Sequence, residues 1–367
     1  MNRPNSGSTT PSSALAALLA ASAGKPLVAP APPSGGLAAL LGSSARSAPA
    51  SSSSLLAALL GTPAPAPTPS PPRWIAVRKR FEQFARNLNL TIPQIADGVT
   101  KYQGVVGCLN RHYYGGAAAP ADVAFPIGSW AKGTATRPPR DVDLYFVLPP
   151  AVHARFEAYQ WNRQSALLQE VKDVLAATYP ATDMRGDGQV VVVQFESYAV
   201  EVVPAFLLVN GRYWICDTNG GGKYKTTDPV AERSVVDAVD KANAGNLRQL
   251  VRMLKAWQDY CSVPIKSFAL ELVAAEFLAQ SEWRLNDFFY YDWLVRDFFL
   301  YLYAKAGKVI VLPGTGEVIA LGDDWKSRVV TAYSRAVEAC DNERDNYLHL
   351  AGDEWQKIFG PQVPVAP

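Results

Sequence analysis

The sequence predicts an α+β fold, in which a core with a mixed sheet is followed by a helical domain. Two β-rich runs, residues 190–195 and 200–208, are separated by a short turn, which is typical of a hairpin. Another apolar run, residues 142–148, lies between two pairs of prolines. Beyond residue 230 the chain is predominantly helical in pattern as far as residue 359. The order of helix, mixed core and further helices therefore favours an α+β domain with a helical domain after it.

The first 73 residues form a separate leader. They contain no Asp, no Glu and no aromatic residue, so they cannot bury enough apolar surface to offset the entropy of ordering, and we expect them to be disordered. A Leu- and Ala-rich string recurs three times, at residues 15–19, 37–41 and 55–60, which argues against a signal peptide. Each string forms either a transient helix or a short helix in a partner's groove. We favour the transient helix, because short isolated helices are marginal in water.

The remaining elements follow in order within a core of residues 74–229 and a helical domain of residues 230–367. Apolar residues from Ile75 to Leu88 recur at helical spacing, and after a break near residues 91–93 a second helix runs to residue 113. We then expect a loop over 115–120, the strand at 142–148, a helix over 151–177, the hairpin and a turn at 219–222. The helical domain is broken at Pro264 and around residues 309–322.

Composition limits the partners and the compartment. The chain has 35 Lys and Arg, and without the four in the leader 31 remain against 33 Asp and Glu. Such a body lacks the basic excess of proteins that bind long nucleic acids. Four cysteines without paired spacing favour free thiols in a reducing cytoplasm and argue against a zinc site. No apolar run reaches the roughly 20 residues that span a bilayer, so we expect no membrane segment.

Three acidic residues in apolar strands are the candidate metal ligands. Side chains alternate along a strand, so Asp141 and Asp143 project from the same face. Two carboxylates this close repel each other unless a cation lies between them, and oxygen ligands favour Mg²⁺. Glu201 lies among valines in the second strand of the hairpin. If that strand neighbours the aspartate strand, Glu201 completes a cluster able to hold two metal ions; otherwise it is an outward-facing acid on an edge strand.

A Gly/Ser/Thr-rich segment precedes the aspartates. Gly128 and Ser129 begin a predicted loop that runs to Thr136. Glycine allows the backbone to approach phosphate closely, and the hydroxyl and amides can donate to phosphate oxygens. On its own the Gly-Ser dipeptide is typical of an ordinary turn. Its spacing along the chain from Asp141 and Asp143 is what indicates phosphate binding.

These motifs together resemble the signature of the polymerase-β-like nucleotidyltransferases. The matching segments are residues 125–134 (FPIGSWAKGT), residues 141–144 (DVDL) and residues 201–206 (EVVPAF). More narrowly, the chain resembles the bacterial cyclic-oligonucleotide synthases of CBASS anti-phage systems, relatives of cyclic GMP-AMP synthase and oligoadenylate synthase. Many members carry Asp where this chain has Glu201, a difference of one methylene in reach.

The resemblance implies both a reaction and a set of site residues. The reaction joins nucleoside triphosphates into a cyclic di- or trinucleotide with release of pyrophosphate, using two Mg²⁺ or Mn²⁺ ions held by Asp141, Asp143 and Glu201. The product would activate a separate effector protein. The resemblance also implies that Lys255 contacts the triphosphate, that Ser267 binds phosphate and that Phe268 stacks on a base.

The helical residues can also be interpreted without the family. Arg248, Arg252 and Lys255 share one face of a predicted helix, opposite an apolar stripe that begins at Leu247. A basic stripe of this kind is more often solvated than functional. Phe268 is equally well explained as a core residue. The three histidines are isolated and the aromatic cluster over residues 283–303 is typical of helix core, so we assign both to packing or surface roles.

Two other functions are compatible with the sequence. The first is a nucleotidyltransferase that extends a linear oligonucleotide or an RNA end, which the mild acidity of the body disfavours. The second is an inactive scaffold that recruits partners through the leader, which the presence of all three acids disfavours. Base choice, ring size and linkage stay open at this point.

Overall fold

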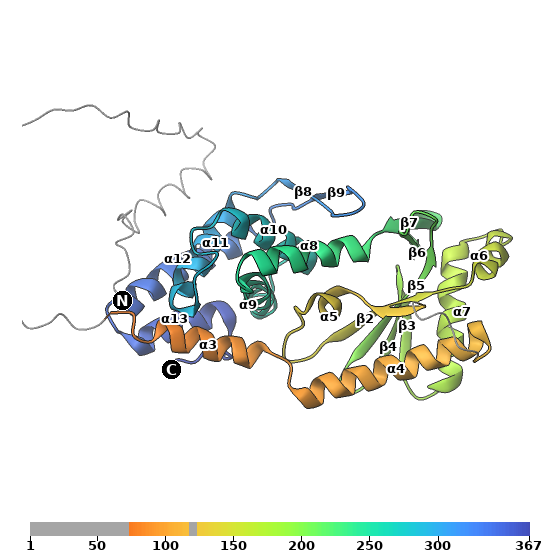
Figure 1. The fold of residues 1–367 in the computed structure, drawn as a ribbon, viewed down its shortest axis with the longest axis horizontal. Coiled ribbons are helices and arrows are strands. Elements are labelled where there is room, and N and C mark those ends of the chain that lie inside the picture. The colour runs from red at the N-terminus through yellow and green to blue at the C-terminus, as the bar shows by residue number, and fades with distance from the viewer. Residues whose placement is uncertain (1–72, 117–122) are drawn as a thin grey trace, which may run out of the picture. The chain divides into compact units, whose positions relative to one another are not determined.

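A computed structural model describes residues 73–116 and 123–367 (Figure 1). The predicted leader lies outside these residues except for Arg73. The described chain begins with the helices α3 (Val77–Leu88) and α4 (Ile92–Tyr114), as the sequence predicts. Helix α4 begins within the predicted break near residues 91–93, because Thr91 and Gln94 form a capping box and a proline occupies the first turn.

A seven-stranded mixed sheet forms the centre of the core in the described part of the chain. Its strands are β1 (Ala124–Pro126), β2 (Asp141–Val147), β3 (Asp183–Asp187), β4 (Val190–Gln194), β5 (Ala199–Leu207), β6 (Tyr213–Asp217) and β7 (Lys223–Thr227). The order is β1-β2-β5-β4-β3, and β6 pairs with both β5 and β7. Strands β2 and β5 are parallel, and the other pairs are antiparallel. The predicted hairpin is the β4–β5 pair.

Alternation along β2 and β5 separates the two faces of the sheet. Leu144 and Phe146 on β2 are buried, and the even-numbered residues of β5, such as Val200 and Val202, join them in one apolar core. Helices α4, α6 (Pro150–Glu157) and α7 (Arg163–Thr178) cover that core, to which β3, β4 and β6 also contribute. The odd-numbered residues of both strands therefore face away from these helices. That opposite face carries the candidate acids.

Two expectations for the core were wrong. The helix predicted over residues 151–177 is two helices, because the Asn162 side chain accepts a hydrogen bond from Ser165 N and starts α7 anew. The segment around residues 214–229, where only a turn at 219–222 was expected, contains most of β6 and all of β7.

The C-terminal part is helical with one small hairpin. Its helices are α8 (Pro229–Ala242), α9 (Asn246–Tyr260), α10 (Ser267–Gln280), α11 (Tyr291–Tyr303), α12 (Lys326–Arg344) and α13 (Leu348–Phe359), and the hairpin is β8 (Val309–Val311) and β9 (Val318–Ala320). Helix α3 packs among these helices, with Phe81 against Trp355 and Phe84 against Phe359. The predicted breaks at Pro264 and around 309–322 are confirmed. The domain boundary at residues 229/230 stays a prediction.

Three further expectations can be compared with the described residues. All four cysteines are free. The aromatic cluster is core, since Tyr291, Phe298 and Phe299 are almost fully buried. None of the described helices combines the length and apolar character needed to cross a membrane.

Candidate active site

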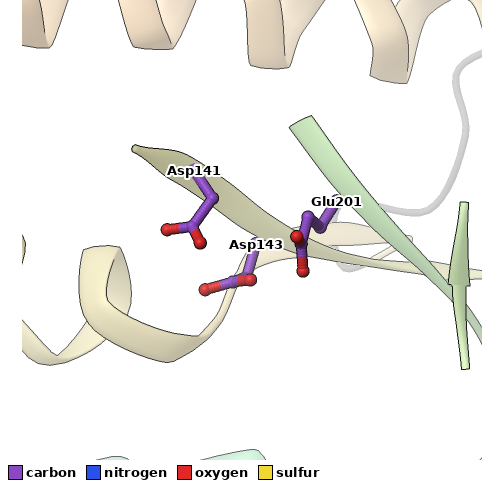
Figure 2. Close-up of side chains that lie close together, drawn as sticks. All are labelled: Asp141, Asp143 and Glu201. Carbon is purple, nitrogen blue, oxygen red and sulfur yellow. The ribbon is translucent and has the colours of Figure 1, made fainter. Parts of the chain in front are cut away.

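The three predicted acids converge on one face of the sheet. Asp141 and Asp143 project from β2, and the parallel pairing with β5 places Glu201 directly opposite Asp143 in the register. Ligand oxygens of the three carboxylates lie within 4.8 Å of one another, and all three side chains are half-buried (Figure 2). Completion of the cluster required the Glu201 strand to neighbour the aspartate strand. The pairing of β2 with β5 meets this requirement.

The electrostatics of this acidic cluster favour a bound cation. Burial, followed by the negative charges of Asp141 and Glu201, raises the pKa of Asp143 to about 7, although Lys255 acts in the opposite direction. Burial and the charge of Asp141 likewise raise the pKa of Glu201. Half-buried carboxylates that repel one another and offer only oxygen ligands fit Mg²⁺ or Mn²⁺. The donor set therefore suits the divalent ions that the sequence predicts.

Gly128 allows the Gly-Ser segment to lie against the acidic cluster. Its φ is +54°, and a Cβ there would overlap Asp143 Oδ2 and lie 2.9 Å from Asp143 Cγ. Ile127 N donates to Asp143 O at 2.9 Å, which fixes this approach. The predicted loop is partly the short helix α5 (Gly128–Lys132). Glycine is thus required both for the left-handed φ and for the contact with the carboxylate.

Trp130 of α5 ties the aspartate strand to helix α4. Its indole Nε1 donates to Asp141 O at 2.8 Å. The ring packs so closely on α4 that a Cβ at Gly98 would lie 2.5 Å from the indole Cη2. The ring also contacts Tyr198 edge-on, with centroids 5.8 Å apart. The backbone position of Asp141 therefore depends on an aromatic residue packed against a glycine of α4.

A cleft of about 220 Å³ collects the predicted nucleotide-binding residues. Seven of the eight predicted site residues line it: Gly128, Ser129, Asp141, Asp143, Lys255, Ser267 and Phe268. Glu201 is the eighth, and it lies beside Asp143 on the neighbouring strand. A larger cleft of about 980 Å³ shares Gly128, Lys132, Asp143 and Phe268 with the first. The acidic cluster is therefore accessible from both clefts.

The basic stripe of α9, Arg248, Arg252 and Lys255, contacts backbone carbonyls rather than solvent. Arg248 Nε donates to Lys132 O at 2.7 Å and Arg252 Nη1 donates to Gly133 O at 2.5 Å. Lys255 Nζ donates to Thr134 O at 3.1 Å. The interpretation of a solvated face is wrong for this stripe. Burial lowers the pKa of Lys255, while the negative charges of Glu271 and Asp141 act in the opposite direction.

Ser267 and Phe268 form the first turn of α10. Ser267 Oγ donates to Gln258 Oε1 at 2.7 Å and also lines the smaller cleft. Phe268 is half-buried and lines both clefts, so part of its ring is available to a ligand. Their roles toward phosphate and base stay predictions.

Sequence reasoning missed a buried ion pair in the wall between the clefts. Lys132 Nζ lies 2.8 Å from Glu271 Oε1 and 3.2 Å from Glu232 Oε2, with side chains 9% exposed for Lys132 and 5% for Glu271. The pair joins α5 to α10 beside the acidic cluster. A signal was present, because Glu271 falls one helical turn after Ser267 and so lies on the same face.

Comparisons with known proteins agree with this geometry. Residues 75–240 match the model of the Second Messenger Oligonucleotide or Dinucleotide Synthetase domain. A probable cyclic nucleotide synthase of Bacillus cereus (strain VD146) is 24% identical over 179 residues, which cover 46% of this chain and 52% of that protein. The chain thus spans about half the length of this curated relative.

Solved structures share the fold. CdnC of E. coli MS115-1 with ATP has a TM-score of 0.58 at 21% identity, covering 78% of this chain and 98% of that one. CdnG of Bradyrhizobium diazoefficiens with GTP has a TM-score of 0.54 at 14% identity, covering 82% and 97%. DncV of Vibrio cholerae, with the linear intermediate pppA(3′,5′)pG, has a TM-score of 0.55 at 14% identity, covering 79% and 88%.

The fold and the matched domain over residues 75–240 together indicate the class of protein, a nucleotidyltransferase. More particularly, it carries a domain of the second-messenger oligonucleotide or dinucleotide synthetases, and it is similar to cyclic nucleotide synthases. The predicted fold class and the predicted enzyme class are confirmed.

Proposed function

We propose that this protein joins nucleoside triphosphates into a cyclic di- or trinucleotide, using two Mg²⁺ or Mn²⁺ ions held by Asp141, Asp143 and Glu201. The observation that supports this most directly is the convergence of the three carboxylates beside a cleft that also contains Gly128 and Lys255. When bound, the ions supply neutralisation of negative charge on the attacking and leaving oxygens.

The protein's own residues position the substrate and offset its charge. The backbone of Gly128 and the hydroxyl of Ser129 approach the phosphates, and Lys255 offsets their charge. Ser267 contributes a phosphate contact from α10, and Phe268 stacks on a base, a contact worth about 1–3 kcal/mol. Positioning and charge stabilisation account for most of the catalysis of phosphoryl transfer, so no covalent intermediate is needed.

Each bond is formed by one displacement. A ribose hydroxyl oxygen attacks the α-phosphorus of a neighbouring triphosphate, and the bond from that phosphorus to the bridging oxygen of the β-phosphate breaks. Pyrophosphate leaves, and the hydroxyl proton passes to a carboxylate of the acidic cluster or to solvent. A further attack of the same kind on the 5′-triphosphate of the linear product closes the ring.

The proposal extends to the role of the product. In keeping with the resemblance, the cyclic nucleotide activates a separate effector protein in anti-phage defence, and the reaction takes place in the cytoplasm. Structural relatives were solved with ATP, with GTP and with a linear dinucleotide intermediate, which supports free nucleotides as substrates here.

The test is incubation of the full chain with Mg²⁺ and labelled ATP, GTP, CTP and UTP, followed by phosphatase treatment, chromatography and mass analysis. We expect short, phosphatase-resistant products that do not require RNA. Products that lengthen only when RNA is added would instead indicate an RNA-end nucleotidyltransferase. The Asp141→Asn/Asp143→Asn double variant should form no product. A cellular effect unchanged in that variant would favour the inactive scaffold.

A further inference from the structure

The hairpin formed by residues 307–322, which includes β8 and β9, leaves the helical part and reaches the core sheet. Its ladder extends beyond the two strands, since Gly307 N donates to Gly322 O at 2.8 Å and Leu321 N donates to Lys308 O at 2.9 Å. Ile310 is 2% exposed and anchors the hairpin, and β8 lies against α10. A two-stranded hairpin is marginal alone, so its position depends on what it touches.

The tip of the hairpin is held against β6, β7 and the start of α8. Arg212 Nη2, just before β6, donates to Gly314 O at 2.6 Å. Lys225 Nζ on β7 lies 3.0 Å from the carboxylate of Glu317. Gly314 itself sits tightly at the start of α8, because a Cβ there would lie 2.6 Å from the Asp228 Cβ. These contacts make the hairpin a strap between the helical part and the sheet.

The inner side of this strap is a wall of the larger cleft. Leu312, Glu317 and Ile319 line the cleft of about 980 Å³, which also contains Gly128 and Asp143 of the acidic cluster. Its volume is at the upper end of ligand pockets, so it has room for more than one nucleotide. A molecule bound at the acidic cluster and extending into this cleft therefore meets the strap.

We propose that the strap retains the linear intermediate in the cleft between formation of the first and the last phosphodiester bond. This inference rests on the proposed function. The chain presents one set of three carboxylates in its described residues, so both displacements need the same acidic cluster. The linear product must turn so that its own 5′-triphosphate takes the place of the triphosphate that the first displacement consumed. A product that leaves during this turn is released before the ring is closed. The strap forms the wall that prevents this loss.

The contacts at the tip of the hairpin are weak enough for the strap to open. The Lys225 and Glu317 side chains are 32% and 35% exposed, and exposed ion pairs of this kind alter an equilibrium constant by no more than about fivefold. The strap is therefore closed by several weak contacts, and a finished ring can leave when they separate.

Two glycines at the tip provide a matched test. Gly314 and Gly316 have similar φ values of +79° and +72°, and neither lines the cleft. A Cβ at Gly316 meets nothing within 4 Å, whereas one at Gly314 collides with α8. Gly314→Ala and Gly316→Ala thus add similar backbone strain, but only the first pushes the tip of the strap away from the start of α8.

The experiment measures the ratio of linear to cyclic product by mass analysis, together with the initial rate of pyrophosphate release, in the full chain. We expect Gly314→Ala to raise the ratio several-fold while the initial rate stays within about twofold, and Gly316→Ala to match the wild type. An unchanged ratio in Gly314→Ala, or equal changes in both variants, would overturn the inference. If the wild type forms no nucleotide product at all, the proposed function fails instead.

A charge exchange tests the same strap without altering glycine. Glu317→Lys places two cations together, and we expect the linear fraction to rise about two- to fivefold. Combining it with Lys225→Glu restores an opposite-charge pair and should return the fraction toward the wild-type value. A double variant that releases as much linear product as Glu317→Lys alone would contradict the role of this contact.

Discussion

Replacing Gly128 by alanine should separate metal binding from folding. The added Cβ would overlap Asp143 Oδ2, so the carboxylate has to turn away from Asp141 and Glu201. The left-handed φ of +54° adds about 1–2 kcal/mol of backbone strain. Removing a residue that only hydrogen-bonds to a metal ligand weakens metal affinity about 10- to 100-fold. Displacing the ligand itself should therefore lower metal affinity by roughly 100-fold or more.

Gly133→Ala is the matched control, because Gly133 ends the same short helix with a φ of +67°. Its Cβ would lie 3.2 Å from Arg248 Nε, so Arg248 has to give way by a few tenths of an ångström, but no carboxylate of the acidic cluster is within 4 Å. We expect Gly133→Ala to bind Mn²⁺, measured by electron paramagnetic resonance, within about threefold of the wild type. Equal Mn²⁺ affinity in Gly128→Ala and Gly133→Ala would refute the reasoning about the carboxylate contact.

Three more predictions concern the surroundings of the acidic cluster. Gly98→Ala should displace the indole that donates to Asp141 O and lower turnover at least tenfold. By contrast, Gly107→Ala on the same helix, whose Cβ lies 3.8 Å from an arginine side chain, should keep turnover and gain up to about 1 kcal/mol of stability in urea unfolding. The raised pKa of Asp143 means that the folded metal-free protein binds the proton more tightly than the unfolded chain. Between pH 3.8 and about 7 this group should therefore lower the stability as pH rises, by at most about 4 kcal/mol. Asp143→Asn in EDTA should remove the contribution of Asp143 and leave that of Glu201, whose pKa is also raised; a slope unchanged in the variant would contradict the assignment. Lys132→Met should lower the free energy of unfolding in urea by about 3–5 kcal/mol, because it leaves Glu271 buried without its partner. Combining it with Glu271→Leu should recover most of that loss. An equal loss in the single and the double variant would argue against the ion pair.

The acidic cluster could be predicted because it breaks an otherwise apolar pattern. Asp141 and Asp143 alternate with buried residues of β2, and the period of two fixes their common face. Glu201 lies in an equally apolar strand, but the sequence left open whether this strand adjoins β2. Only the parallel pairing of β2 with β5 makes Glu201 the neighbour of Asp143, and parallel pairing joins segments far apart in the chain.

The missed strands lack the pattern on which strand prediction depends. Strand β3 (Asp183–Asp187) has one buried residue among five, so no apolar face distinguishes it from a loop. Strand β7 (Lys223–Thr227) contains two lysines and lies at the end of the sheet path, where charged residues are common because they discourage pairing with other chains. Polar strands at the margin of a sheet are stabilised by their ladder partners, which local sequence does not reveal.

The basic stripe of α9 shows why a regular spacing of charges along a helix does not reveal what these charges contact. Arg248, Arg252 and Lys255 have the spacing of a solvated face, and the same spacing matches three consecutive carbonyls, those of residues 132–134. These carbonyls follow the short helix α5 and lack helical partners, so they accept hydrogen bonds from the cations. The three residues lie more than a hundred positions before the stripe, which is why the partner was not visible locally. Since the same contacts hold the segment that follows Gly128 and Ser129, the shape of the smaller cleft depends on α9 as much as on the sheet.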